Sequence, residues 1–166
     1  FDTNSNIWSV GGKQSDDKFY LSRSATVGTN PAIVVDTTNK VGIGITTPSG
    51  VLDLGSATNG RAISWGGTSN NYDNIWAAYS SGSLVLAGGL RGATATDTYV
   101  SSYGGSMARE AIRLDSTGVI QFFTDAATTV PDGNAVTPTE RMRITSTGNV
   151  GIGTTGPLNR FSVYHD

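Results

Sequence analysis

The sequence predicts an all-β protein whose subunits bury much of their surface against one another. Val, Ile and Thr, which favour strands, account for 45 of its 166 residues. The chain contains three lysines and two glutamates, so the residue types that usually cover exposed helix faces are scarce. Leu, Ile, Val and Phe make up 36 residues, enough for folding but few for the core of an isolated chain. A thin core with 22 glycines is typical of subunits that complete their burial in an assembly.

Composition also excludes several classes of function. The formal net charge is −2, so there is no basic footprint of the kind that binds nucleic acid. No apolar run approaches the roughly 20 residues of a membrane-spanning helix, and no charged-then-apolar signal segment opens the chain. The lack of cysteine excludes thiolate metal sites, and the single histidine, His165, excludes multi-histidine ones. We therefore expect no metal, no other cofactor, no nucleic acid and no membrane partner.

The strongest pattern in the chain is an internal repeat. Residues 32–54 (AIVVDTTNKVGIGITTPSGVLDL) align without gaps to residues 141–163 (RMRITSTGNVGIGTTGPLNRFSV). A partial third copy, AIRLDSTGVIQFF, occupies residues 111–123. The repeat predicts that the same local structure recurs along the chain.

Each full copy predicts a strand, a tight turn and a second strand. The β-branched run at 33–35 predicts the first strand of the first copy, and the turn Ser146-Thr147-Gly148-Asn149 of the second copy accepts positive φ. Val-Gly-Ile-Gly then alternates with the period of a strand, and its glycine face favours close approach of another backbone. The proline after Thr-Thr ends this strand. Residues 52–54 and 161–163 resume an alternating strand.

The region between the copies has a different composition. Residues 55–110 hold six of the nine Trp and Tyr residues, and residues 83–90 predict one strand that runs into a glycine turn. Residues 106–114 predict either one or two helical turns or the first strand of the third copy, and residues 125–139 predict a surface loop or hairpin tip. We divide the chain into an N-terminal β shaft (1–54), a central aromatic and Gly-rich β module (55–110) and a C-terminal shaft or neck (111–166).

The second copy resembles a known family. Residues 140–163, ERMRITSTGNVGIGTTGPLNRFSV, resemble the neck repeat of bacteriophage tail fibres and tailspikes, which other viral and bacterial surface fibres also carry. The first copy departs from this pattern at Ala32, Asn39-Lys40 and Ile45, and the copies together cover about a third of the chain. The resemblance implies an elongated, interwoven homotrimeric β fibre with short strands and Gly-rich turns. It also implies that an intramolecular chaperone domain commonly follows the repeat.

The resemblance further implies a structural virion component. The chain is then a segment of a tail fibre or tailspike on the particle surface, and it contributes to host-cell attachment. Its implied partners are two further copies of itself, other virion tail proteins, and a glycan or protein receptor on the host. We expect a fragment or processed piece of a longer fibre, and no enzymatic activity. Three alternatives stay open: a polysaccharide-degrading tailspike with acidic residues shared between subunits, a non-viral surface adhesin, and a pure shaft.

The alternating strands of the repeat supply the candidates for the trimer core. Val41 and Ile43 share one face of their strand, as do Val150 and Ile152. Three chains packed around a common axis would bury these side chains, and each fully buried Val or Ile contributes about 1.5–3 kcal/mol of stability. A monomer lacks this burial, so we expect these four side chains on the trimer axis.

The aromatic region supplies the candidates for ligand contact. Aromatic faces beside amides and carboxylates suit a glycan, although the same aromatics suit a core or a subunit interface. Asp73 is the best single catalytic acid and Asp97 the next, but no spacing forces two acids together as a glycosidase requires. The candidate contact residues are Trp65, Tyr72, Asp73, Trp76 and Tyr79.

Overall fold

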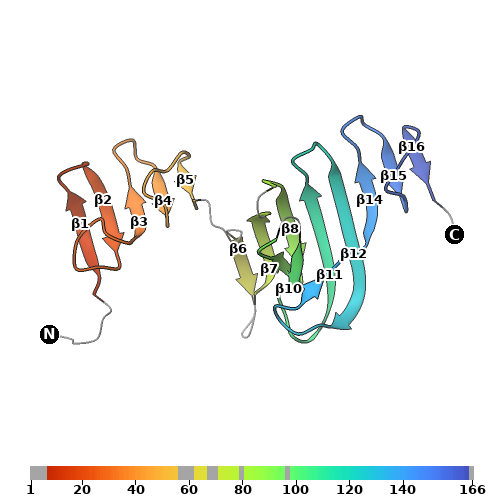
Figure 1. Ribbon diagram of the computed structural model, residues 1–166, viewed down its shortest axis with the longest axis horizontal. Helices are drawn as coiled ribbons and strands as arrows, with labels where there is room; N and C mark the ends of the chain where they lie inside the picture. The colour runs from red at the N-terminus through yellow and green to blue at the C-terminus, as the bar shows by residue number, and fades with distance from the viewer. Residues whose placement is uncertain (1–6, 56–61, 67–70, 79–80, 96–97, 165–166) are drawn as a thin grey trace. The chain divides into compact units, whose positions relative to one another are not determined.

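The computed structural model describes residues 7–55, 62–66, 71–78, 81–95 and 98–164, with the backbone alone at residues 62, 71 and 72 (Figure 1). These residues form strands, turns and irregular segments, and no helix occurs among them. The expected all-β class is therefore confirmed for the described part of the chain, which also contains no helix able to cross a membrane. The chain divides into two compact units, Phe1–Ala57 and Thr58–Asp166.

The described residues of the first unit form a single five-stranded sheet. Its strands are β1 (Ser9–Lys13), β2 (Lys18–Ser22), β3 (Pro31–Val35), β4 (Val41–Ile43) and β5 (Leu52–Asp53), in that order across the sheet. The strands from β1 to β4 pair antiparallel with their neighbours, and β5 pairs parallel with β4. On one face Tyr20 and Val34 are 3% and 0% exposed. The loop at residues 23–30 lies over this face, because a Cβ built on Gly11 would lie 3.7 Å from Val27 Cγ2 and the Gly28 N–H donates to Ser22 Oγ.

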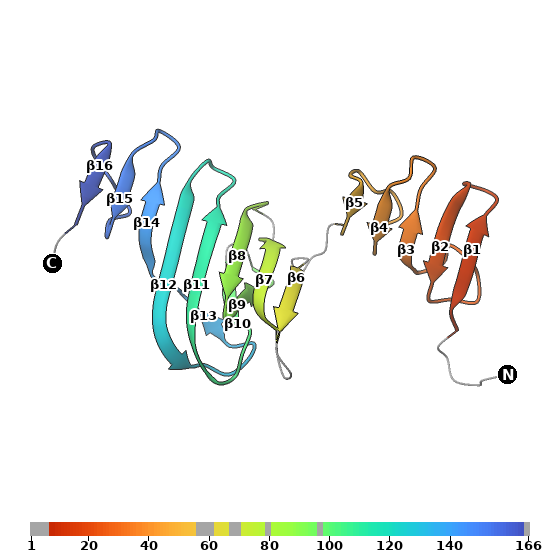
Figure 2. The ribbon, with the colours of Figure 1, turned by 180° about the vertical axis from the view of Figure 1, so that it is seen from behind.

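The described residues of the second unit form two sheets (Figure 2). Its strands are β6 (Ala62–Gly66), β7 (Asn71–Ala77), β8 (Leu84–Gly88), β9 (Leu90–Gly92), β10 (Tyr99–Ser101), β11 (Ser106–Leu114), β12 (Ile120–Thr129), β13 (Ala135–Val136), β14 (Glu140–Ile144), β15 (Val150–Ile152) and β16 (Phe161–Val163). Eight of them form the sheet β16-β15-β14-β12-β11-β8-β7-β6, and the other three form the sheet β13-β10-β9. Only the β15–β16 pair is parallel within the described sheets of this unit.

The core of the second unit lies between its two sheets. Leu90 and Tyr99 of the small sheet pack on residues of the large one, and the rings of Trp76 and Tyr99 meet edge to face at 6.1 Å. The small sheet therefore covers one face of the large sheet over β7, β8, β11 and β12. The buried cluster consists of Trp76, Ala78, Val85, Leu90, Tyr99, Ala111 and Phe123.

The same turn joins the strands in all three copies of the repeat. The residue with positive φ is Asn39 (63°) between β3 and β4, Gly118 (86°) between β11 and β12, and Gly148 (83°) between β14 and β15. In each turn this residue donates its N–H to the carbonyl three residues earlier. The predicted strand–turn–strand units are thus confirmed, including the partial third copy.

The glycine face of the repeat is closed by the chain's own loop. A Cβ added to Gly42 would lie 2.6 Å from the carbonyl oxygen of Ile45, and one added to Gly151 would lie 2.6 Å from that of Thr154. Only glycine admits a backbone at this distance, which explains the predicted close approach. After this loop the chain forms β5 or β16, which pairs parallel with the strand before the loop. The alternating sequence pattern did not predict this parallel pairing.

The structure selects one of two alternatives for residues 106–114 and corrects two other local predictions. Residues 106–114 form strand β11, the second alternative, because they pair with β8 and β12 on both sides. The predicted loop at 125–139 is partly strand, because β12 continues to Thr129 opposite Ser106. The second strand of each full copy ends at a positive-φ glycine, Gly44 or Gly153, several residues before the proline. The expected boundary between residues 110 and 111 falls inside β11.

Candidate functional site

One face of the large sheet carries two continuous rows of apolar side chains, here called the apolar face. Strand register places the members of each row directly opposite one another across the sheet. The longer row is Ile63, Ile75, Leu86, Ile112, Phe122, Met142, Ile152 and Val163. The shorter row is Ala77, Leu84, Leu114, Ile120, Ile144, Val150 and Phe161.

The apolar face is extensively exposed to solvent. Leu84, Leu86, Ile112 and Leu114 at its centre are each 39–42% exposed, and Phe161 at one edge is 64% exposed. A monomer in water rarely leaves so large a contiguous apolar patch uncovered, and such patches mark interaction sites. The face is therefore the strongest candidate for a binding surface in the second unit.

The residues predicted for the trimer core lie on exposed apolar faces. Val150 and Ile152 belong to the two rows of the large sheet, and Ile152 is 38% exposed. Val41 and Ile43 occupy the matching positions of the first unit, where Ile43 is 41% exposed. Their placement on a trimer axis stays a prediction.

The predicted aromatic contact residues are separated by the sheet. Trp65 in β6 is 53% exposed, whereas Trp76 in β7 is 2% exposed and packs in the core against Tyr99. Trp76 is thus corrected to a core residue, because its ring is covered by the small sheet and cannot reach a ligand. Tyr72 has only its backbone described, in β7, and Tyr79 lies outside the described residues. Asp97, the second candidate acid, lies outside them too.

A polar row borders the apolar face beside Leu86 and Ile112. Trp65, Asp73, Gly88, Glu110 and Thr124 lie opposite one another in register. A Cβ built on Gly88 would lie 2.7 Å from Glu110 Oε1 and 3.3 Å from Asp73 Oδ1, so both carboxylates converge over this glycine. Glu110 also lines a shallow hollow of about 330 Å³ with Ile112 and Phe122. Sequence reasoning found Asp73 and missed Glu110, because the two are adjacent only through their pairing with β8.

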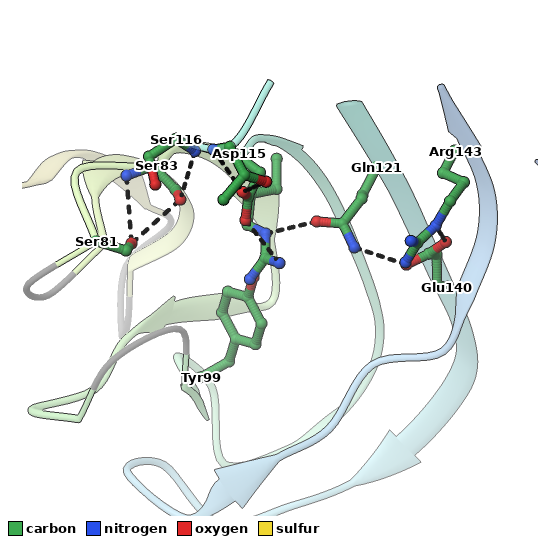
Figure 3. Close-up of polar contacts among 10 residues, drawn as sticks. Ser81, Ser83, Tyr99, Asp115, Ser116, Gln121, Glu140 and Arg143 are labelled. Atoms are coloured by element: carbon green, nitrogen blue, oxygen red, sulfur yellow. Dashed lines mark hydrogen bonds and ion pairs between the residues drawn. The ribbon is translucent and has the colours of Figure 1, made fainter. Parts of the chain in front are cut away.

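The opposite face of the sheet carries a hydrogen-bonded charge network (Figure 3). The Arg113 Nε donates to Gln121 Oε1 at 2.7 Å, and the Gln121 Nε2 donates to Glu140 Oε2 at 2.6 Å. Arg143 donates to both Glu140 oxygens, at 2.5 and 2.6 Å, while Arg113 pairs with Asp115 at 3.0 Å. The network ties β11, β12 and β14 together. Its charges balance, so we assign it a structural role.

The network sets the ionisation of its carboxylates. Burial raises the pKa of Glu140, but the hydrogen bonds from Arg143 and Gln121 outweigh it and hold the pKa below its ordinary value. Hydrogen bonds from Thr117 likewise lower the pKa of Asp115. Arg113 and Arg143 occupy equivalent positions of the repeat, and this equivalence was the available sequence signal that both face the same side.

Among the described residues, no group of three or more His, Cys, Asp or Glu side chains could hold a metal ion. The chain matches no family model and no curated protein. The functional assignment therefore rests on the surface of the molecule and on the repeat.

Proposed function

We propose that this chain is a structural segment of a homotrimeric β-fibre, in which the apolar faces of three copies pack around a common axis. The observation that carries the proposal is the pair of uninterrupted apolar rows across the large sheet, half-exposed in the single chain. Burying these side chains between copies contributes about 25 cal/mol for each Å² of apolar surface. Enclosure between copies also protects a long sheet from uncontrolled aggregation.

The biological setting we propose is a bacteriophage tail fibre or tailspike on the virion surface, with a role in host attachment. The support for this step is the resemblance of residues 140–163 to the neck repeat. Three linked copies raise avidity for a host glycan or protein receptor above that of one weak site. The polar row is the proposed contact region, because Trp65 is exposed and like-charged carboxylates are costly to bury inside a trimer.

The assembly is tested by the mass of the protein in solution. Light scattering should give a mass near three chains, maintained over a wide range of dilution. A compact monomer at every concentration would contradict the proposal, because the apolar rows would then be stable in water without a partner.

Receptor contact is tested separately on the assembled protein. Binding to an array of bacterial surface glycans should be lost in Trp65→Ala and kept in Leu158→Asp, a change of a 91% exposed side chain in the β15–β16 loop. An array that stays blank for the intact trimer would favour a pure shaft, whose recognition domain lies elsewhere in the fibre.

The carboxylates beside Gly88 support a second candidate function, cleavage of a surface polysaccharide. The oxygens of Asp73 and Glu110 are at most about 6 Å apart by their distances from the Gly88 Cβ position. This upper bound permits the separation of about 5–5.5 Å between the two carboxyl groups of a retaining glycosidase. If these acids act, Asp73→Asn and Glu110→Gln should each abolish turnover of a capsular polysaccharide while leaving the trimer intact. Full turnover in both variants would remove this candidate.

A further inference from the structure

We infer that the chain carries two separate self-association faces, one in each unit, and that each packs against the same unit of another copy. The inference rests on the proposed assembly and specifies which surfaces hold it together. The inferred assembly surface includes strands that lie outside the sequence repeat. The two units then contribute to assembly independently of each other.

The first observation is that the two units share a five-stranded building block. The order β1-β2-β3-β4-β5 of the first unit matches β11-β12-β14-β15-β16 of the second. In both, three antiparallel pairs are followed by one parallel pair. The full sequence repeat covers only the last three strands of each block. The strand pairing shows that β1 and β2 are also equivalent in position to β11 and β12.

The second observation is that the first unit repeats both apolar rows. Val10 and Phe19, which precede the sequence repeat, are 63% and 45% exposed, and Leu52 at the other edge is 59% exposed. One row is Val10, Leu21, Ile33 and Ile43, and the other is Phe19, Val35, Val41 and Leu52. These rows correspond strand by strand to those that contain Ile112 and Ile120 in the second unit.

The third observation is that the opposite faces of the two blocks differ. The first unit has Tyr20 and Val34 where the second has Gln121 and Arg143 at the same register positions. Tyr20 and Val34 are buried apolar residues, whereas Gln121 and Arg143 belong to the charge network. The two sheets are therefore closed on this side by different chemistry. Both sheets share the exposed apolar face. Because their other sides are stabilised in different ways, the shared face is better explained by binding to the same kind of partner than by a contribution to the stability of each sheet.

The chemistry of the rows identifies the partner as a second copy of the same unit. Neither row contains a charged side chain, so the partner must offer an uncharged apolar surface two rows wide. The same unit of another copy offers this surface with the same spacing. The polar row with Asp73 and Glu110 depends on β7, β8 and β11, and the described residues of the first unit form no strands equivalent to β7 and β8. This difference favours binding of the first unit to the first unit of another copy, and of the second unit to the second, over binding between a first and a second unit.

The test uses Ile43→Asp and Ile152→Asp, which are equivalent positions of the repeat, in the full chain. Both side chains are partly exposed in the single chain, so aspartate can remain hydrated there, and circular dichroism checks that the strands persist. Each single variant should still assemble, with half-dissociation at a concentration at least about tenfold higher than for the unchanged protein, because one tethered contact is lost. The double variant should be monomeric by light scattering.

Matched controls place aspartate on the opposite side of each unit. Ala25→Asp lies in the loop over the buried face of the first unit, and Leu158→Asp lies in the loop that closes Gly151. Both controls should assemble like the unchanged protein. If either single variant at the rows is as monomeric as the double variant, the two faces are not independent and the inference fails. A monomeric unchanged protein would instead overturn the proposed assembly itself.

A crosslinking measurement detects the first face directly. The chain has no cysteine, so an Ile43→Cys change in the Ile152→Asp background introduces one reactive thiol. A short bismaleimide should join chains through this position, and it should not join chains that carry Ala25→Cys in the same background. Equal crosslinking at the two positions would overturn the inference.

Discussion

Gly148 shows how a single backbone position determines the turn between β14 and β15. Its φ is +83°, and a Cβ placed on it would meet nothing within 4 Å. Any effect of a side chain here therefore comes from the backbone conformation alone. The equivalent position in the first unit is Asn39, the residue type that best tolerates positive φ after glycine.

We expect Gly148→Ala to lower the free energy of unfolding by about 1–2 kcal/mol, because an L side chain destabilises the left-handed conformation. The matched control is Gly156→Ala, whose Cβ would also meet nothing within 4 Å but whose φ is not positive. The control should change the free energy of unfolding by less than about 1 kcal/mol in either direction. Urea denaturation at one fixed protein concentration measures both. Equal effects of the two substitutions would contradict the conformational explanation.

Glu140 illustrates how the charge network responds to pH. Its pKa in the folded protein lies below its ordinary value, so it contributes stability that is present above about pH 4.3, its unfolded pKa. This contribution is lost as the pH falls through the folded pKa. The unchanged protein should therefore lose stability on acidification, partly through this residue.

Glu140→Gln should lower the free energy of unfolding at pH 7 by about 1.5–3 kcal/mol, because Arg143 loses its charged acceptor. Its stability should also fall less steeply below about pH 4.3 than that of the unchanged protein. Glu110→Gln, at an exposed position on the other face, is the control and should leave stability at pH 7 nearly unchanged. Parallel pH profiles for the unchanged protein and Glu140→Gln would refute the assigned role of the network.

At the scale of elements, Arg109 joins three strands inside the second unit. Its guanidinium is part of a side chain that is 1% exposed, and it donates to the carbonyls of Met107 and Thr128, each at 2.9 Å. It also donates to Ser101 Oγ at 2.9 Å. These bonds connect β10 of the small sheet to β11 and β12 of the large one, at the point where a bulge interrupts the β11–β12 pairing.

Arg109→Lys should lower the free energy of unfolding by at least about 2 kcal/mol, because an ammonium group cannot span these acceptors as the planar guanidinium does. Arg91→Lys, at an exposed arginine that pairs with Asp132, is the control and should cost under about 1 kcal/mol. Denaturant unfolding at fixed protein concentration compares them. Similar losses for the two variants would show that Arg109 does not fasten the small sheet.

At the scale of the whole molecule, folding and assembly should be thermodynamically linked. Because the apolar faces are exposed in the single chain, association stabilises the folded state and its contribution grows with protein concentration. We expect the Tm of the unchanged protein to rise as its concentration is increased over a hundredfold range. The Ile43→Asp/Ile152→Asp double variant should have a Tm independent of concentration. Calorimetry measures both, and a concentration-independent Tm for the unchanged protein would contradict the linkage.

The sequence by itself determined the fold class, the repeated strand–turn–strand units and the faces of the repeat strands. These features are local: β-branched alternation has a period of two, and Gly or Asn at a turn accepts positive φ. For the same reason, alternation alone puts Val41 and Ile43 on one face of their strand, and Val150 and Ile152 on one face of theirs. The close approach over Gly42 and Gly151 followed from the missing side chains.

Only the tertiary structure decided which distant strands lie side by side. Pairing across β8 aligns Leu84 and Leu86 with the repeat strands, and it brings Glu110 next to Asp73. It also places Trp76 beneath the small sheet and leaves Trp65 exposed, although both are tryptophans in neighbouring strands. Register between strands far apart in the chain depends on long-range packing and not on local periodicity. For that reason the extent of the apolar face, and its repetition in the first unit, became visible only in the folded chain.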